Sequence, residues 1–223
     1  MNSVQFQGEK GLTVTLYTLK PRFQAGLRPL ASALAGWGVT ANQVTLAAGF
    51  GSVLVGGLAA GLAEQRWPFL LIPLWMLLRM ALNAIDGMLA RDFGQKSRLG
   101  AYLNELADLI SDAALFLPFA LIAPFDLLWV GLVALLALLS EVAGLLGPLV
   151  GASRRYDGPM GKSDRALVFG ALGFAVGIAP ALPAWSTWVM PALALLLCLT
   201  ILKRVRRGLR ETQEITLRPN HRE

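Results

Sequence analysis

The sequence predicts an all-α integral membrane protein with six transmembrane helices, preceded by an N-terminal amphipathic helix at the membrane interface. Two observations carry this prediction. First, 55% of the 223 residues are hydrophobic and only 15% are charged, whereas about a quarter of the residues in a typical soluble domain are charged. Second, the apolar sequence after residue 38 supplies six stretches close to the 20 or so residues that a helix needs to cross a bilayer.

The positions of lysine and arginine predict the orientation. Of the 20 basic residues, only Arg66 falls in a predicted outer loop and only Arg79 falls within a span. The others precede the first span or follow the second, fourth and sixth, which fits the positive-inside rule with both termini in the cytoplasm of a bacterial cell and the protein in its inner membrane. Topology therefore accounts for the net charge of +6, and we expect no nucleic-acid partner.

Three parts are predicted along the chain. Residues 1–37 form a cytoplasmic lead-in and an interfacial helix, 38–207 hold the six spans, and 208–223 form a charged, solvated cytoplasmic tail. The interfacial helix would start at Pro21, a residue suited to a first turn, while an ordinary linker is the alternative because Pro29 kinks any continuous helix. Its apolar positions recur at helical spacing, at Phe23, Leu27, Leu30 and Leu34.

Cap and turn residues place the spans. Thr40 is a good N-cap for the first, and Trp67 marks the outer interface before the second. The expected spans are 40–63, 68–90, one from 98 or 99 to the turn at 124–126, one from there to about 149, and two within the uncharged run 166–202.

Acidic residues inside the second and third spans are the most informative feature. A charge at the centre of a membrane helix costs about 2.5–3.5 kcal/mol on insertion scales, so Asp86, Asp108 and Asp112 indicate a functional site. Counting about 1.5 Å per residue from Trp67 puts Asp86 roughly 28 Å into a core about 30 Å thick. The site therefore lies at the cytoplasmic rim, with Asn83 one turn deeper on the same face.

The third span carries a polar stripe, because Asn104, Asp108 and Asp112 follow one another at intervals of four residues. Carboxylate and amide oxygens from two facing helices suit magnesium, manganese or calcium rather than zinc. Magnesium usually binds between carboxylates and the phosphates of a substrate, and Arg91 can hold phosphate oxygens with two parallel hydrogen bonds. Gly87 and Gly100 leave room for a close approach.

This stretch resembles the signature of the CDP-alcohol phosphatidyltransferase family, D-x2-D-G-x2-A-R-x8-G-x3-D-x3-D. The spacing matches throughout, but asparagines replace the first and third aspartates, and an amide can bind a hard cation without adding charge. Asp112, one turn beyond the last aspartate, is the expected replacement ligand, and Glu105 is less well aligned. The matching positions are Asn83, Asp86, Gly87, Ala90, Arg91, Gly100, Asn104 and Asp108.

The resemblance implies a membrane enzyme that transfers a phosphatidyl group from CDP-diacylglycerol to an alcohol and releases CMP. Asp108 would be the general base, taking the proton of the alcohol acceptor. The metal, one or two ions of Mg²⁺ or Mn²⁺, would be held by Asn83, Asp86, Asn104, Asp108 and Asp112, and the resemblance also implies a homodimer. The residues implied in substrate binding are Asn42, Thr45, Gly87, Arg91 and Ser97.

Several alternatives stay open at this point. Asn42 and Thr45 would equally serve to cap a helix start, and Arg91 would serve as a positive-inside anchor. Lys162, with Arg154 and Arg155, would bind the phosphate of a phosphorylated acceptor or simply follow the inside-charge rule. Glu141, within the fourth span, would face the polar cavity, be hydrated at the inner end, or form an ion pair with Arg79, which is the interpretation that we favour.

Three other functions compete with phosphatidyl transfer to an alcohol. The roles of the substrates would be reversed if a CDP-alcohol donated its phosphoalcohol to diacylglycerol. A pseudoenzyme would bind lipid or nucleotide without turnover, although most of the motif is intact. A transporter or proton pathway would carry polar groups across the whole bilayer, yet the outer halves of the spans are almost wholly apolar.

Overall fold

The computed structural model describes residues 14–217, and in that range the chain is helical and contains no strand. The predicted all-α class is therefore confirmed. Short 3-10 helices occupy several of the connections, at Ala63–Gln65, Trp67–Leu70, Leu117–Leu121, Gly147–Val150 and Ala184–Trp188. The α-helices of this range are α1 (Val14–Gly36), α2 (Ala41–Gly61), α3 (Leu71–Asp92), α4 (Arg98–Phe116), α5 (Leu127–Leu145), α6 (Lys162–Ile178) and α7 (Val189–Leu217).

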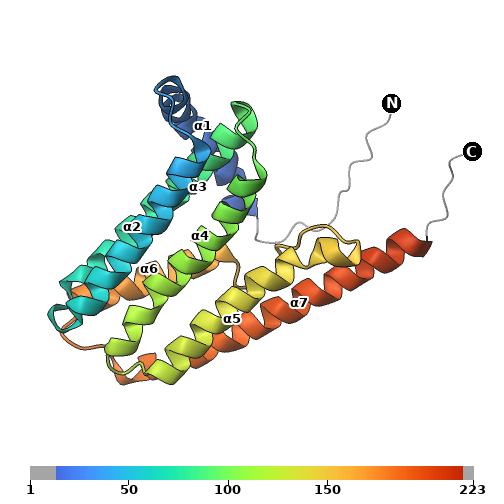
Figure 1. Cartoon of the computed structure of the whole chain (residues 1–223). Coiled ribbons are helices and arrows are strands. Elements are labelled where there is room, and N and C mark those ends of the chain that lie inside the picture. Colours follow the sequence, from blue (N-terminus) through green and yellow to red (C-terminus); the bar gives the residue numbers. More distant parts are fainter. Residues whose placement is uncertain (1–13, 218–223) are drawn as a thin grey trace, which may run out of the picture.

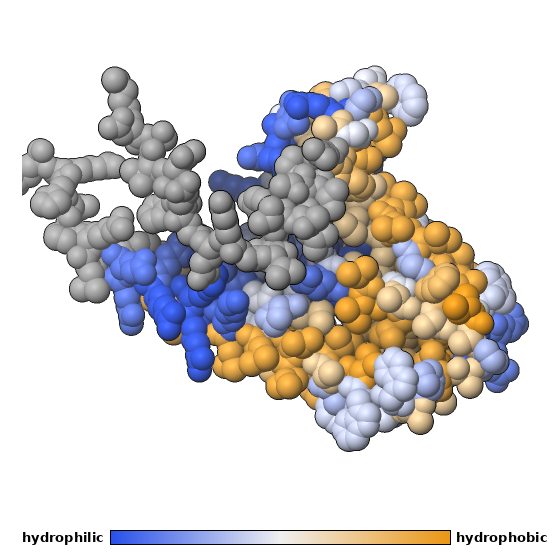
Figure 2. Space-filling view, turned by 180° about the vertical axis from the view of Figure 1, so that it is seen from behind, coloured by the Kyte–Doolittle hydropathy of each residue, from blue (hydrophilic) through white to orange (hydrophobic). Residues whose placement is uncertain are grey.

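The long helices form a bundle in which α2 packs against both α3 and α4, while α5 and α7 lie side by side (Figure 1). Helix α6 packs on α3 and completes the bundle. One end of the bundle gathers α1, the α3–α4 connection and the connection before α6 (Figure 1). In the space-filling view, a broad apolar surface covers much of the visible face and hydrophilic residues gather at its edges (Figure 2). This pattern fits a bundle surrounded by lipid.

Four helical segments of the described range are long and apolar enough to cross a membrane, at 41–61, 67–92, 127–145 and 184–214. Helix α4 is not among these segments because it carries the charged residues Glu105, Asp108 and Asp112. Helix α6 is not among them because it has only 17 residues. Both nevertheless pack into the bundle between spanning helices. The count of six spans thus stays a prediction.

An aromatic core holds the bundle together at the end opposite to α1. Phe116, at the end of α4, stacks on Phe169 of α6 with ring centroids 3.7 Å apart. Phe119 meets Phe69 and Phe169 edge-on at 5.2 and 5.4 Å. Each of these rings is almost wholly buried, and such pairs contribute about 0.5–1.5 kcal/mol beyond the burial of their area. Closely packed aromatic rings therefore hold the helices together at the end of the bundle that lies opposite to its polar end.

The N-terminal helix differs from the prediction in its bounds. It begins at Val14, seven residues before the start predicted at Pro21, and it continues through Pro29 without an interruption. Residues 1–13 lie outside the described range. Apolar side chains hold α1 against α3 through Ala31, which packs with Ile85, Met88 and Leu89. Its placement at a membrane interface stays a prediction.

The C-terminal end also differs. The tail expected after Arg207 continues α7 as helix to Leu217, and residues 218–223 lie outside the described range. At about 1.5 Å per residue, the 29 residues of α7 span roughly 43 Å, more than the 30 Å of a bilayer core. Glu211 explains why the extension is ordered, because it accepts hydrogen bonds from Ser153 N at 3.1 Å and Ser153 Oγ at 2.9 Å. The extension is a docking surface for the loop before α6.

Candidate active site

A cavity of about 960 Å³ lies where α2 begins, α3 ends and α4 begins. Sequence positions more than 60 residues apart meet there, because α2 packs against both other helices. Three predicted site residues, Asp108, Asp112 and Lys162, do not line it, whereas ten motif or substrate positions do: Asn42, Thr45, Asn83, Asp86, Gly87, Ala90, Arg91, Ser97, Gly100 and Asn104.

The start of α2 is capped by residues other than Asn42 and Thr45. Thr40 accepts a hydrogen bond from Gln43 N, and the Gln43 side chain accepts one from Thr40 N. Gln95, from the α3–α4 connection, accepts a hydrogen bond from Ala41 N at 2.7 Å. These contacts satisfy two of the free N–H groups of the first turn, those of Ala41 and Gln43. The capping interpretation therefore does not account for Asn42 or Thr45.

Thr45 instead joins α2 to α3 inside the site. Its hydroxyl donates to Asp86 Oδ2 at 2.7 Å and also lies 3.1 Å from Ala41 O. Both Thr45 and Asp86 are about 5% exposed. A buried carboxylate needs such partners because an unpaired charge is costly away from water. The pair fixes the orientation of Asp86 at the wall of the cavity.

Two glycines make room for the polar groups around them. A Cβ atom at Gly87 would lie 3.0 Å from Arg91 Nη1, so a side chain at residue 87 would push the Arg91 guanidinium away from its place over α3 by a few tenths of an ångström. A Cβ at Gly100 would lie 2.7 Å from Asn42 Oδ1 and 2.9 Å from Ser97 Oγ. The Ser97 hydroxyl caps α4 by accepting from Gly100 N at 2.9 Å. Gly100 thus lets α4 begin in contact with α2.

Asp108 sits beside the cavity and is bound through both carboxylate oxygens. Its Oδ1 accepts from Asn83 Nδ2 at 3.2 Å and from Arg79 Nη2 at 3.1 Å. Its Oδ2 forms an ion pair with Lys162 Nζ at 2.5 Å. Lys162 is the most accessible of these partners, with a 38% exposed side chain against 6% for Arg79. The structure therefore brings Lys162 to the predicted general base.

Asp112, predicted as the replacement metal ligand, is instead occupied by two arginines. Arg79 Nη1 lies 2.6 Å from Asp112 Oδ1, and Arg165 Nη2 lies 2.9 Å from Oδ2. Arg165 also binds Glu141 at 2.9 Å. The pairing of Glu141 with Arg79 was therefore wrong: Glu141 pairs with Arg165 and, at 3.5 Å, with Arg204. Helical spacing predicted that Asp112 shares a face of α4 with Asn104 and Asp108. It could not predict that Arg79 of α3 and Arg165 of α6 face the Asp112 carboxylate.

The side chains around the cavity limit the number of metal ions that it can bind. Among residues 14–217 as described, no three Asp, Glu, His or Cys side chains are grouped so that they would hold a metal ion. The carboxylate and amide side chains that line the cavity on α3 and α4 are those of Asp86, Asn83, Asn104 and Glu105, and the Glu105 carboxylate is already bound by Arg154. The other carboxylate and the two amides suit one hard ion whose remaining ligands are substrate phosphates and water, and they are too few for two ions.

One residue of the site, Arg165, was not predicted from the sequence except as an inside charge. Its side chain is 1% exposed and ties α4 to α5. Arg154 forms a bidentate ion pair with Glu105 at the cavity wall, with one N–O distance of 2.9 Å. A signal existed for Arg79, which precedes Asn83 by one helical turn and so shares its face. No comparable signal marked Arg165.

A model of the CDP-alcohol phosphatidyltransferase family matches residues 38–200. The chain belongs to the CDP-alcohol phosphatidyltransferase family. It is 46% identical over 202 residues to the inner membrane protein YnbA of Escherichia coli K12, which covers 91% of this chain and 100% of YnbA. It is 31% identical over 106 residues to the archaetidylinositol phosphate synthase of Pyrococcus horikoshii, covering 48% of this chain and 54% of the synthase.

The fold of this CDP-alcohol phosphatidyltransferase family member is similar to that of the Mycobacterium tuberculosis phosphatidylinositol phosphate synthase PgsA1. Two crystal structures of PgsA1, one in complex with manganese and citrate and one with CDP-DAG bound, give TM-scores of 0.65 and 0.67 at 21% sequence identity. They cover 81% of this chain and 88% and 92% of the PgsA1 chains. The predicted family, the enzyme class and the place in phospholipid biosynthesis are thereby confirmed at the level of the family.

Proposed function

We propose that this protein transfers a phosphatidyl group from CDP-diacylglycerol to an alcohol acceptor and releases CMP. The observation that carries the proposal is the cavity of about 960 Å³, because it is lined by motif residues of α3 and α4 together with the two α2 residues that the family resemblance implies in substrate binding. Helix α2 supplies Asn42 and Thr45, α3 supplies Asp86 and α4 supplies Asn104. The relatives add support, since PgsA1 has been crystallised with CDP-DAG bound.

The nucleotide would bind at the α2–α4 end of the cavity. Asn42, next to Gly100, and Ser97 present polar groups there, and Arg91 has a planar guanidinium that can hold two oxygens of the pyrophosphate. Lys96 and Arg98 line the same wall and add positive charge. The phosphates would then meet Asp86, Asn83 and Asn104, the three residues that we propose for one Mg²⁺ or Mn²⁺ ion. When bound, the ion offsets the negative charge that develops on the pyrophosphate as CMP leaves.

Asp108 would accept the proton of the acceptor alcohol. Arg79 and Asn83 hold Oδ1 from the buried side, so Oδ2, bound by the more exposed Lys162, is the oxygen that the acceptor would reach. As the proton passes to Oδ2, the alcohol oxygen attacks the phosphorus that carries diacylglycerol. The bond from that phosphorus to the bridging oxygen breaks, and CMP departs with that oxygen. Lys162 would then be free to contact a phosphate of the acceptor.

A second candidate, a pseudoenzyme that binds CDP-activated lipid without turnover, is favoured by one observation. Both oxygens of Asp108 are already bound by Asn83, Arg79 and Lys162, and a base must be able to receive a proton. The same contacts would arise if the site had kept nucleotide binding and lost acceptor chemistry. The two candidates agree on CDP-diacylglycerol binding and differ only on release of CMP.

The relative named an inner membrane protein supports an inner membrane location for this chain. The inward-facing site and termini, and the homodimer, remain predictions from charge distribution and family resemblance. The reversed reaction, in which a CDP-alcohol reacts with diacylglycerol, would use the same residues.

The test is release of CMP by the purified full-length protein in detergent, with CDP-diacylglycerol, Mg²⁺ or Mn²⁺ and a panel of alcohols and phosphorylated alcohols. We expect Asp108→Asn to lower turnover by about 10²–10⁴-fold, the usual contribution of a general base. Asp126→Asn is the matched control, because Asp126 caps α5 at the other end of the bundle and asparagine caps equally well. If the protein binds CDP-diacylglycerol but releases no CMP with any acceptor, the enzyme proposal is wrong and the pseudoenzyme is the correct candidate.

A further inference from the structure

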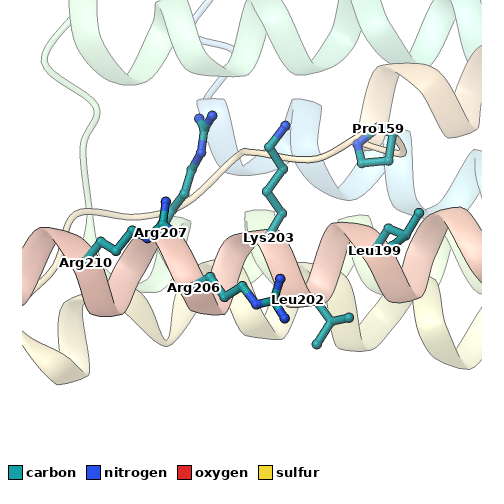
Figure 3. Close-up of a pocket in the computed structure, with 7 residues that line it drawn as sticks. All are labelled: Pro159, Leu199, Leu202, Lys203, Arg206, Arg207 and Arg210. Atoms are coloured by element: carbon teal, nitrogen blue, oxygen red, sulfur yellow. The ribbon is translucent and has the colours of Figure 1, made fainter.

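A second cavity, of about 520 Å³, lies away from the motif residues, between α7 and the segment around Pro159. Figure 3 shows it as a groove along α7. Its lining changes character along the helix: Leu199 and Leu202 are followed by Lys203, Arg206 and Arg210. Because residues three or four apart share a helix face, these positions form one continuous stripe. The groove is therefore apolar at one end and basic at the other.

The basic end has uncompensated positive charge. Among the residues that the structure describes, Lys203, Arg206 and Arg210 form no ion pair, whereas the neighbouring Arg207 pairs with Asp157 at 2.6 Å. In Figure 3 the Arg206 side chain points away from the Pro159 side of α7, so the charges surround the helix face rather than cluster at one point. Each of the three side chains is long, so each can turn toward an anion that binds on this face of α7.

The groove is also preformed, since its loop wall is fastened to α7. Met160 N donates to Thr200 Oγ1 at 3.1 Å, and Arg204 Nε donates to Asp157 O at 3.1 Å. Gly158 packs so closely on Thr200 that a Cβ there would lie 2.4 Å from its methyl group. A ligand therefore meets a fixed surface and need not order the loop.

We infer that this groove binds an anionic phospholipid, with its phosphate among Lys203, Arg206 and Arg210 and an acyl chain along Leu199 and Leu202. The two leucines are 46% and 50% exposed at the end of the uncharged run of α7, where bilayer lipid reaches the protein. A free phosphate would use only the basic end, whereas the apolar end is matched by a lipid chain. This site is separate from the proposed active site and does not depend on the proposed activity.

The experiment compares retention of phosphatidylglycerol and phosphatidylcholine by the full-length protein in detergent, using native mass spectrometry to obtain dissociation constants. Each basic residue near an anionic lipid strengthens binding by about fivefold. We therefore expect Lys203→Gln/Arg206→Gln/Arg210→Gln to weaken phosphatidylglycerol binding by about a hundredfold, and Arg206→Gln alone by about fivefold. Arg28→Gln, which removes one exposed charge from α1, is the control and should change binding by less than about twofold.

Equal binding of the two lipids by the wild type would overturn the inference, as would a triple variant that keeps the wild-type preference. Displacement of phosphatidylglycerol by inorganic phosphate would overturn the assignment to a lipid, because the apolar end would then contribute nothing. Thermal unfolding reports whether the triple variant is folded. If the triple variant is not folded, the single variant Arg206→Gln tests the inference, and unchanged phosphatidylglycerol binding in that variant would overturn it.

Discussion

Arg79 joins the two aspartates of α4 that lie in the polar interior, Asp108 and Asp112. Its guanidinium reaches Asp108 Oδ1 at 3.1 Å and Asp112 Oδ1 at 2.6 Å, with a side chain only 6% exposed. Replacing it with methionine keeps the length and helix propensity of the side chain but removes both ion pairs. Removal of one partner from a buried pair costs about 3–5 kcal/mol. Since Lys162 still faces Asp108 and Arg165 still faces Asp112, we expect the lower end, about 3 kcal/mol.

For a chain of this size, 1 kcal/mol corresponds to about 2–4 °C in melting temperature, so Arg79→Met should melt about 6–12 °C below the wild type. Tryptophan fluorescence during heating, in one detergent and at one scan rate, measures this difference. Arg28→Met is the control: its ion pair with Asp92 has a 68% exposed arginine, and such pairs contribute about 0–1 kcal/mol. An Arg79→Met protein that melts within about 2 °C of the wild type would refute the reasoning.

Three further predictions address the site and its surroundings. Titration of Mn²⁺ with CDP-diacylglycerol present should give one ion per chain, with tighter binding in Asn83→Asp/Asn104→Asp; two ions in the wild type would contradict the donor set. Gly100→Ala should displace Asn42 and raise the KM for CDP-diacylglycerol up to about tenfold, as for one lost hydrogen bond; an unchanged KM would remove Asn42 from the nucleotide site. Burial raises the pKa of Asp157, but hydrogen bonds from two arginines outweigh it and hold that pKa below its ordinary value. The stability that this group contributes is therefore present above about pH 4 and is lost as the pH falls through the lowered pKa, so the melting-temperature gap between Asp157→Asn and wild type should close at low pH.

The helical class and most helix bounds could be predicted because they depend on local sequence. The predicted start of the third span at residue 98 or 99 agrees with α4, which begins at Arg98 behind the Ser97 cap. The helix bounds differ from the prediction where long-range contacts override local composition. Residues after Arg207 are charged enough to predict a solvated tail, yet Glu211 binds the loop at Ser153 and the helix continues.

The sequence by itself determined the family and ten of the eighteen residues that line the cavity, because the motif determines which residues share a face of α3 and of α4. It could not determine what faces each carboxylate, since that depends on packing between helices far apart in the chain. Asp86, Asp108 and Asp112 looked alike as acids in an apolar sequence. Only the tertiary structure showed that their partners differ. Asp86 lines the cavity and accepts a hydrogen bond from Thr45, Asp108 forms an ion pair with Lys162, and Asp112 forms ion pairs with Arg79 and Arg165.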